Sequence, residues 1–274
     1  MAHELQHRYS PLVDAKLRAV LVKKDGVIFN TRYQGDPTAG TVQVPVRDTE
    51  VAVGDYNKQE GATKSHGDTS YIPVAIDKDK AVNEIIDGYD AAAVPDNLTA
   101  DRLDSAAYSL AYQMDKDATA VLEAKATAHG GTEALTAENV YASIVGMRTA
   151  MSKAHVPDDG RRWLLVSPDT YALILTDKEH FVHSTALGDA VIATGAVGKI
   201  AGYLVFEDTT LSAKVEMIAG HPDWCVRVAE WKVPVHLQDL AGSGEYIGAS
   251  AVQGRYVYAH AVTKPKTLLI KKQA

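Results

Sequence analysis

Three short stretches near the start of the chain alternate apolar and polar residues: 41–46 (TVQVPV), 49–53 (TEVAV) and 71–76 (YIPVAI). A period of two is typical of half-buried β-strands. Between them, residues 54–69 contain one large apolar side chain, Tyr56. A two-stranded ribbon is marginal alone in water, and no helical pattern is interleaved to cover its apolar face. We therefore expect another copy of the chain to cover it.

If a neighbouring copy covers this ribbon, the apolar side chains of the ribbon and its loop are the contact residues. The predicted intersubunit contacts are Val42, Val44, Val51, Val53 and Tyr56. The sequence assigns these residues no catalytic, cofactor-binding or metal-binding role.

A long amphipathic helix is predicted over residues 97–129. Apolar residues recur at steps of three and four from Leu103 to Leu122, and many of them are alanines, which allow close approach of a neighbouring element. Asn97 or Thr99 can cap its start, and no Gly or Pro interrupts it before Gly130. A helix of this length reaches roughly 45 Å, since each residue adds about 1.5 Å.

The remaining elements are shorter. A helix is predicted at 10–23, another from Thr136 to Val156 with a hydrophobic staple, and a third beginning at the Ser167-Pro168 cap. No element is assigned to 77–96. Further strands are predicted at 161–166, 203–207, 215–219, 224–228, 256–261 and 267–270. Helices and strands occupy separate stretches without regular alternation, so the fold class is α+β.

Composition is that of an ordinary soluble acidic protein. The 274 residues are 46% hydrophobic and carry a formal net charge of −7. The chain lacks the basic balance of a nucleic-acid reader. Its single cysteine, Cys225, forms no internal disulfide and is interpreted as a buried apolar residue. There is no signal peptide and no apolar run long enough for a membrane span, so we expect a protein made and first used in the cytoplasm.

Local charge varies along the chain. Residues 77–138 hold thirteen acidic and five basic residues, while the first 33 residues and the C-terminal end are basic. One interpretation of this distribution is that the charged residues lie on solvated surfaces. The alternative is charge complementarity between copies of the chain, in which the basic arm of one copy meets the acidic body of another.

No segment of the sequence gives a strong signal for a phosphate-binding, metal-binding or catalytic site. The segment 195–200 (GAVGKI) resembles a phosphate loop, but its spacing is wrong and Ile200 stands where Ser or Thr would hold Mg²⁺. His180 and His183, with Asp177 and Glu179 nearby, are too few and too loosely arranged for a predicted zinc site. Asp158-Asp159 and Gly242-Ser243-Gly244 are interpreted as turns. No catalytic residue and no cofactor is predicted.

The block from Val156 to Leu211 carries a family resemblance. It reads VPDDGRRWLLVSPDTYALILTDKEHF and then GDAVIATGAVGKIAGYLVFEDTTL. A strand ending in Ser-Pro, a helix beginning at that Pro, and a Gly-x-x-Gly-x-x-x-Gly loop before a short strand resemble the major capsid proteins of tailed bacteriophages. Gly195, Gly198, Gly202, Val205 and Phe206 match that loop. The order of elements along the whole chain is also similar to this family, which has the Hong Kong 97-type shell fold.

The resemblance implies a division of the chain into an N-terminal arm, an extended two-stranded E-loop, a spine helix, a peripheral domain and an axial domain. The corresponding residues are 1–28, 29–76, 97–129, 77–133 with 232–274, and 134–231. It further implies a virion protein whose hexamers and pentamers close an icosahedral shell around double-stranded DNA. Its assembly partners would be a portal and a scaffold, expected as a separate protein because no long segment precedes the arm.

Some shells of this family join neighbours covalently through a Lys of the extended loop and an Asn of the peripheral domain. Lys58 and Lys64 lie on the loop here, but the last Asn of the chain is Asn139, so the C-terminal part of the peripheral domain offers no Asn acceptor. We therefore expect no such cross-link.

Two alternatives stay open from the sequence. An encapsulin-like nanocompartment shares the fold and encloses enzymes, although the Val156–Leu211 block favours the phage family. The alternative from another class is an enzyme with an unrecognised site.

Overall fold

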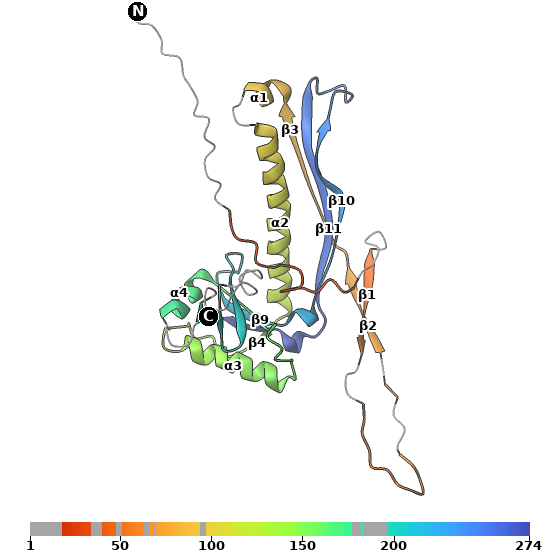
Figure 1. The fold of residues 1–274 in the computed structure, drawn as a ribbon, viewed down its shortest axis with the longest axis vertical. Helices are drawn as coiled ribbons and strands as arrows, with labels where there is room; N and C mark the ends of the chain where they lie inside the picture. Colours follow the sequence, from red (N-terminus) through yellow and green to blue (C-terminus); the bar gives the residue numbers. More distant parts are fainter. Residues whose placement is uncertain are drawn as a thin grey trace, which may run out of the picture.

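The computed structural model describes residues 18–33, 40–47, 51–62, 66–67, 69–93, 97–176, 182–183 and 197–274. The molecule is elongated (Figure 1). Its compact part contains a seven-stranded sheet with two helices. From this part, a long helix and a three-stranded sheet extend in one direction, and a loop extends in the other. No described helix is long and apolar enough to cross a membrane.

The elements follow one another in this order: β1 (Thr41–Arg47), β2 (Thr69–Ala75), β3 (Lys78–Asp87), α1 (Gly88–Ala93), α2 (Leu98–Lys125), β4 (Thr127–Ala128), α3 (Val140–Lys153), β5 (Trp163–Val166), α4 (Pro168–Thr176), β6 (Val182–His183), β7 (Gly198–Ile200), β8 (Tyr203–Glu207), β9 (Val215–Gly220), η2 (Pro222–Trp224), β10 (Cys225–Asp239), β11 (Ala249–Val262), η3 (Pro265–Thr267) and β12 (Leu269–Lys272).

The seven-stranded sheet has the order β4-β12-β9-β5-β8-β7-β6 and carries apolar side chains on both faces. Strand β5 reads WLLV without alternation, and all four of its residues are fully buried. Leu164 and Val166 pack with residues of α3 and α4 on one face, while Trp163 and Leu165 pack with residues of α2 on the other. A strand covered on both faces needs no polar alternation, which explains its continuous apolar run.

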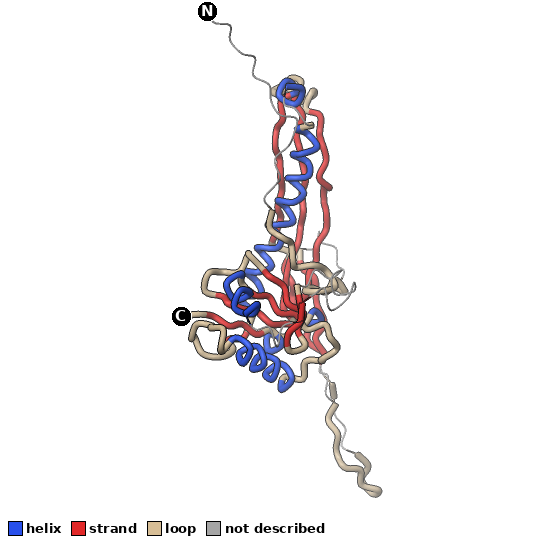
Figure 2. The backbone as a smooth tube through the Cα atoms, turned by 60° about the vertical axis from the view of Figure 1, so that its left-hand side comes forward, coloured by secondary structure: helices blue, strands red, loops and turns tan. Residues whose placement is uncertain are grey.

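Helix α2 lies along the three-stranded antiparallel sheet β10-β11-β3 (Figure 2). Leu103 and Ala106 of the helix pack against Val82, Ile86 and Val252 of the sheet. Farther along, the hydroxyl of Tyr258 in β11 donates to Asp117 of the helix, with an oxygen–oxygen distance of 2.7 Å. The helix and sheet therefore stiffen one another along their shared length.

The cap predicted for the long helix is confirmed, and its predicted end is wrong. The Asn97 side-chain oxygen accepts a hydrogen bond from the main-chain N–H of Ala100 at 3.3 Å. The helix stops at Lys125, five residues before Gly130, because Ala126 turns extended and Thr127 pairs with Leu269 of β12, its N–H donating to the carbonyl of Leu268. Strand pairing with distant residues ends this helix before the glycine signal does.

The Ser-Pro helix start is confirmed: the Ser167 hydroxyl accepts from the N–H of Thr170 at 3.2 Å at the start of α4. The helix predicted from Thr136 begins at Val140 instead, after a turn closed by the Asn139 side chain. Residues 18–23 are not helical, although a helix was predicted over 10–23; the rest of that segment lies outside the described residues.

Several strand predictions are also corrected. Strands β10 and β11 are 15 and 14 residues long, well beyond the predicted 224–228 and 256–261. Residues 51–53 form no strand, and 69–75 pair instead with 41–47. Strand β3 was missed because its helix-facing side includes Glu84, paired with Arg102 of α2, so the apolar alternation is diluted.

The last segment of the chain, 232–274, divides between the two large sheets. Strand β11 pairs with β3 in the three-stranded sheet, whereas β12 pairs with β9 and β4 in the seven-stranded sheet. Cys225, at the start of β10, is buried in the apolar cluster below α2, as expected from the sequence.

Candidate functional site

The base of the ribbon packs on its own chain. Strands β1 and β2 pair antiparallel, and Val42, Val44 and Val74 are buried against Val226 and Val228 of β10. The prediction that another copy of the chain covers this ribbon is therefore wrong for Val42 and Val44. Their cover comes from strands about 180 residues later in the sequence, which local periodicity could not reveal.

The tip of the ribbon is different. The side chains of Val51, Val53 and Tyr56 are 80%, 97% and 73% exposed, respectively, and the loop projects well away from the rest of the chain (Figure 1). Two hydrogen bonds between Asn57 and Gly61 close a turn at its end. An anchored base with a bare apolar tip has the geometry of a contact element for another molecule.

The opposite end of the molecule also exposes large apolar side chains. Tyr89 of α1 is 80% exposed, and Ile247, in the turn between β10 and β11, is 93% exposed. Gly88 lies so close to Gly248 that a Cβ on it would come within 3.0 Å of the Gly248 carbonyl. These exposed residues were not found from the sequence, because single apolar residues in turns carry no periodic signal.

Residues 18–19 are fastened to the outer side of α2. The Arg18 guanidinium pairs with Asp104 at 2.7 Å and lies 4.8 Å from the ring centroid of Tyr108. The Tyr108 hydroxyl donates to the carbonyl of Ala19 at 3.0 Å. This segment therefore follows the helix through polar and cation–π contacts.

A buried charge junction lies where this segment, α2, β8 and β10 meet. The Lys23 ammonium contacts Asp208 at 2.6 Å, and both side chains are almost completely buried. It also donates to Thr210, whose hydroxyl lies 2.6 Å from that of Thr119 in α2. Burial raises the pKa of the nearby Asp115 carboxyl, an effect that the charges of Lys23 and Arg227 oppose.

Arg227 extends this junction into β10. Its guanidinium donates to the carbonyl of Lys23 at 2.8 Å, to Asp25 at 3.0 Å and to Nε2 of His260 at 3.1 Å. Burial, followed by the charge of Arg227, lowers the pKa of His260 to about 3. The imidazole is therefore neutral and accepts the hydrogen bond. Asp115 could have been noticed in the sequence as a charge inside the apolar stripe of the helix.

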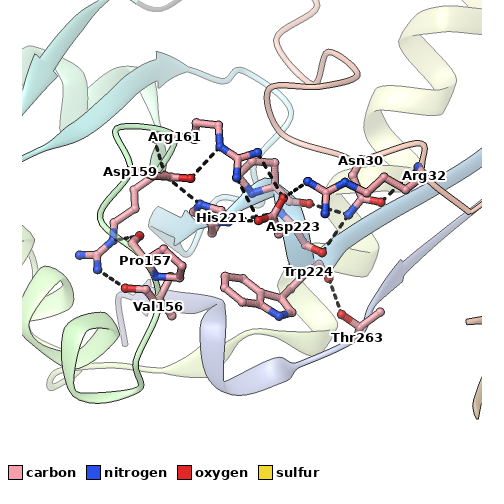
Figure 3. Close-up of polar contacts among 12 residues, drawn as sticks. Asn30, Arg32, Val156, Pro157, Asp159, Arg161, His221, Asp223, Trp224 and Thr263 are labelled. Carbon is pink, nitrogen blue, oxygen red and sulfur yellow. Dashed lines mark hydrogen bonds and ion pairs between the residues drawn. The ribbon is translucent and has the colours of Figure 1, made fainter. Parts of the chain in front are cut away.

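A second polar junction is shown in Figure 3. His221 is fully buried, with Nε2 at 3.1 Å from Asp159 and Nδ1 accepting from the N–H of Asp223. Because Nδ1 accepts, the ring proton lies on Nε2 and is donated to Asp159. Although burial opposes it, hydrogen bonds from His221 and Arg161 hold the pKa of Asp159 well below its usual range.

Asp223 joins this junction to residues 30–32. Arg161 donates to both of its carboxylate oxygens at 3.2 and 3.0 Å, and Arg32 contacts it at 2.7 Å. The Asn30 amide donates to the carbonyls of Pro222 and Asp223 at 2.8 and 2.9 Å. Both junctions therefore hold the N-terminal segment on the compact part. The turn at 158–160 was predicted from the sequence, but its ion pairs were not.

The structure gives the other sequence candidates no chemical role. Gly198 and Gly202 lie in β7 and the tight β7–β8 turn, while Gly195 lies outside the described residues. His180 is also outside them, and only the main chain of His183, in β6, is described. Within the described ranges, no group of three or more His, Cys, Asp or Glu could hold a metal ion.

Comparison with known proteins identifies the class of protein. A family model described as phage capsid protein matches residues 83–269, which is more than half of the chain. The chain therefore belongs to the phage capsid protein family, and it is a structural shell subunit of a virion rather than an enzyme. No curated protein matches it.

Solved capsid structures share the fold over nearly the whole chain. Mycobacterium phage Che8 is similar with a TM-score of 0.75 and 20% sequence identity, covering 97% of this chain and 96% of that chain. The capsid of cyanophage P-SCSP1u has a TM-score of 0.76 at 13% identity, covering 98% and 93%. The capsid of an empty GTA particle has a TM-score of 0.71 at 12% identity, covering 98% and 95%. The Hong Kong 97-type fold expected from the sequence is thereby confirmed.

Proposed function

We propose that this chain is a major capsid protein whose hexamers and pentamers close an icosahedral shell around packaged double-stranded DNA. The observation that carries the proposal is the projecting loop: its base is anchored on the chain's own sheet, while Val51, Val53 and Tyr56 at its tip have no cover among the described residues. Burying such side chains on a neighbouring subunit removes apolar surface from water, at about 25 cal/mol per Å².

The contact residues of the proposed shell follow from this division. Val51, Val53 and Tyr56 are the proposed intersubunit contacts of the loop, and Val42 and Val44 hold its base. The exposed Tyr89 and Ile247 at the far end of the molecule offer a second apolar contact. Contacts at both ends of an elongated subunit suit closed assemblies in which every copy meets several neighbours.

The two large sheets support a regional division. We propose an arm over 1–28, an extended loop over 29–76 and a peripheral region of 77–133 with β10 and β11. The axial region is 134–231 together with β12, because β12 completes the seven-stranded sheet.

The proposed partners are the chain itself, a separate scaffolding protein and a portal, with assembly in the host cytoplasm. DNA would be enclosed without sequence-specific binding. The net charge of −7 supports this, because a protein that neutralises many phosphates needs a strongly basic surface.

Size-exclusion chromatography with negative-stain electron microscopy of the purified full chain tests the proposal. We expect closed particles of megadalton size when the scaffolding protein is present during assembly, and small oligomers alone under that condition would contradict it. Nuclease-protected double-stranded DNA in particles from infected cells is the second expected result. Particles that protect enzymes instead of nucleic acid would favour the nanocompartment alternative.

A further inference from the structure

A cavity of about 340 Å³ lies in the compact part, between helix α3 and the segment that follows α2. Its walls come from three parts of the chain: the turn at 129–133, the first turns of α3, and strands β9 and β12. The residues that matter for its chemistry are His129, Asn139, Ser143, Met147, Met217 and Lys271. No role in the shell subunit described above uses this cavity.

Lys271 contributes a buried charge to the cavity wall. The residue is only 6% exposed, and its ammonium donates one hydrogen bond, to the carbonyl of Gly131. Glu133 also lines the cavity. An ammonium group has three N–H donors, and the carbonyl of Gly131 takes one of them. The other two can point to a ligand in the cavity.

Helix α3 adds to the positive character of the same cavity. Its N-cap residue, Asn139, makes no side-chain hydrogen bond to the first turn of the helix, and Ala142 and Ser143 of that turn line the cavity. In that turn the N–H of Val140 donates to the carbonyl of Thr136 and the N–H of Ser143 donates to the carbonyl of Asn139, so the start of the 14-residue helix contributes the partial positive charge of its dipole.

The imidazole of His129 completes the arrangement. A Cβ at position 146 would lie 3.3 Å from its Nε2, so the glycine inside α3 gives the ring room against the helix. Gly in a helix interior costs roughly 0.5–1 kcal/mol relative to Ala, and here it admits a polar ring to the cavity wall. Met147 and Met217 supply an apolar side to the same space.

We propose that this cavity binds a small anion, with Lys271 and the first turn of α3 holding a phosphoryl or carboxylate group. His129 and Ser143 supply further polar contacts, and the two methionines face the carbon atoms of an organic ligand. Its volume exceeds that of a bare ion and falls within the range of small-molecule sites. The inference does not depend on the proposed architecture of the shell.

Isothermal titration calorimetry of the full chain at constant ionic strength tests this site, with inorganic phosphate and succinate as probes. We expect saturable binding of at least one probe. Lys271→Met should weaken that binding about 10- to 100-fold, since a charge-assisted hydrogen bond contributes about 1.5–3 kcal/mol. The exposed neighbour provides the matched control, and Lys272→Met should bind as the wild type does.

A second variant covers the case in which Lys271→Met fails to fold. Ser143→Leu keeps the ammonium and fills the cavity, so it should also abolish binding. The absence of saturable binding of both probes to the wild-type chain would overturn the proposal. Equal affinity in the wild type and in the two cavity variants would overturn it as well.

Discussion

The indole ring of Trp163 occupies the place where a side chain at Gly220 would be. The two residues face one another across the antiparallel pairing of β5 and β9, and Trp163 is fully buried. A Cβ on Gly220 would lie 2.7 Å from Cη2 of the indole and 2.9 Å from Cδ1 of Leu268. The absence of a side chain at Gly220 therefore makes room for the largest residue of the core.

This relationship predicts that Gly220→Ala destabilises the folded chain by about 1–3 kcal/mol, because the added methyl group overpacks the core. Urea denaturation followed by tryptophan fluorescence measures the change. Gly242→Ala is the matched control, since a Cβ there would meet nothing within 4 Å. Equal stability of both variants would show that the sheet yields to accommodate the methyl group.

The buried pair of Lys23 and Asp208 gives a second prediction. Lys23→Met should cost about 3–5 kcal/mol of unfolding free energy, because the Asp208 carboxylate is left buried without its counter-ion. Lys24→Met, at the exposed neighbouring position, should change little. The double variant Lys23→Met, Asp208→Leu should recover most of the loss in the same denaturation experiment. A double variant as unstable as the single one would assign the loss to packing.

His260 predicts a pH dependence of stability. Its pKa is about 3 in the folded chain, below the ordinary value of 6.5, so between these pH values the unfolded chain binds the proton and the folded chain does not. Stability should therefore fall as pH falls from 6.5, by up to about 1.4 kcal/mol per pH unit for one group. The raised pKa of Asp115 acts in the opposite direction.

The variant His260→Gln keeps an acceptor for Arg227 and removes this titration. Its unfolding free energy should depend less on pH between 6.5 and 4 than that of the wild type. The exposed His66→Gln is the control and should retain the wild-type slope. Parallel pH profiles for the wild type and His260→Gln would exclude His260 as the source.

A charge introduced at the tip of the ribbon should affect assembly, whereas a charge introduced at its base should affect stability. Val53→Asp lies at the exposed tip and should leave the thermal unfolding midpoint unchanged while reducing shell formation, seen by electron microscopy. Val44→Asp buries a carboxylate against Val226 and Val228 and should lower stability itself. Normal particles from Val53→Asp would remove the loop tip from the assembly contacts.

We expect no covalent cross-link between the subunits of the shell. The loop carries Lys58, but no Asn follows Asn139, so the C-terminal part of the proposed peripheral region offers no Asn acceptor. Mature shells should therefore run as a single monomer band in denaturing electrophoresis. A ladder of multiples would show that another acceptor side chain reaches the loop.

Features with a local cause could be predicted from the sequence. The long helix, its Asn97 cap and the Ser167 cap of α4 follow from periodicity and from side chains a few residues away. Strand β3 could not be identified from the sequence, because the charged residue Glu84 stands at a helix-facing position where the pattern requires an apolar one. Its partner, Arg102, lies on α2. The two polar junctions were missed for the same reason: the partners of Lys23 and Asp223 are far apart in the sequence.

The sequence by itself determined the α+β class, the main helices, several of the strands and the resemblance to phage capsids, since these rest on short-range patterns and the order of elements. Only the tertiary structure decided what each apolar face meets. Val44 and Val53 lie in similar alternating stretches, yet Val44 is buried under β10 while Val53 is bare. Burial depends on distant strands, and pairing between residues nearly 200 positions apart leaves no trace in a local pattern.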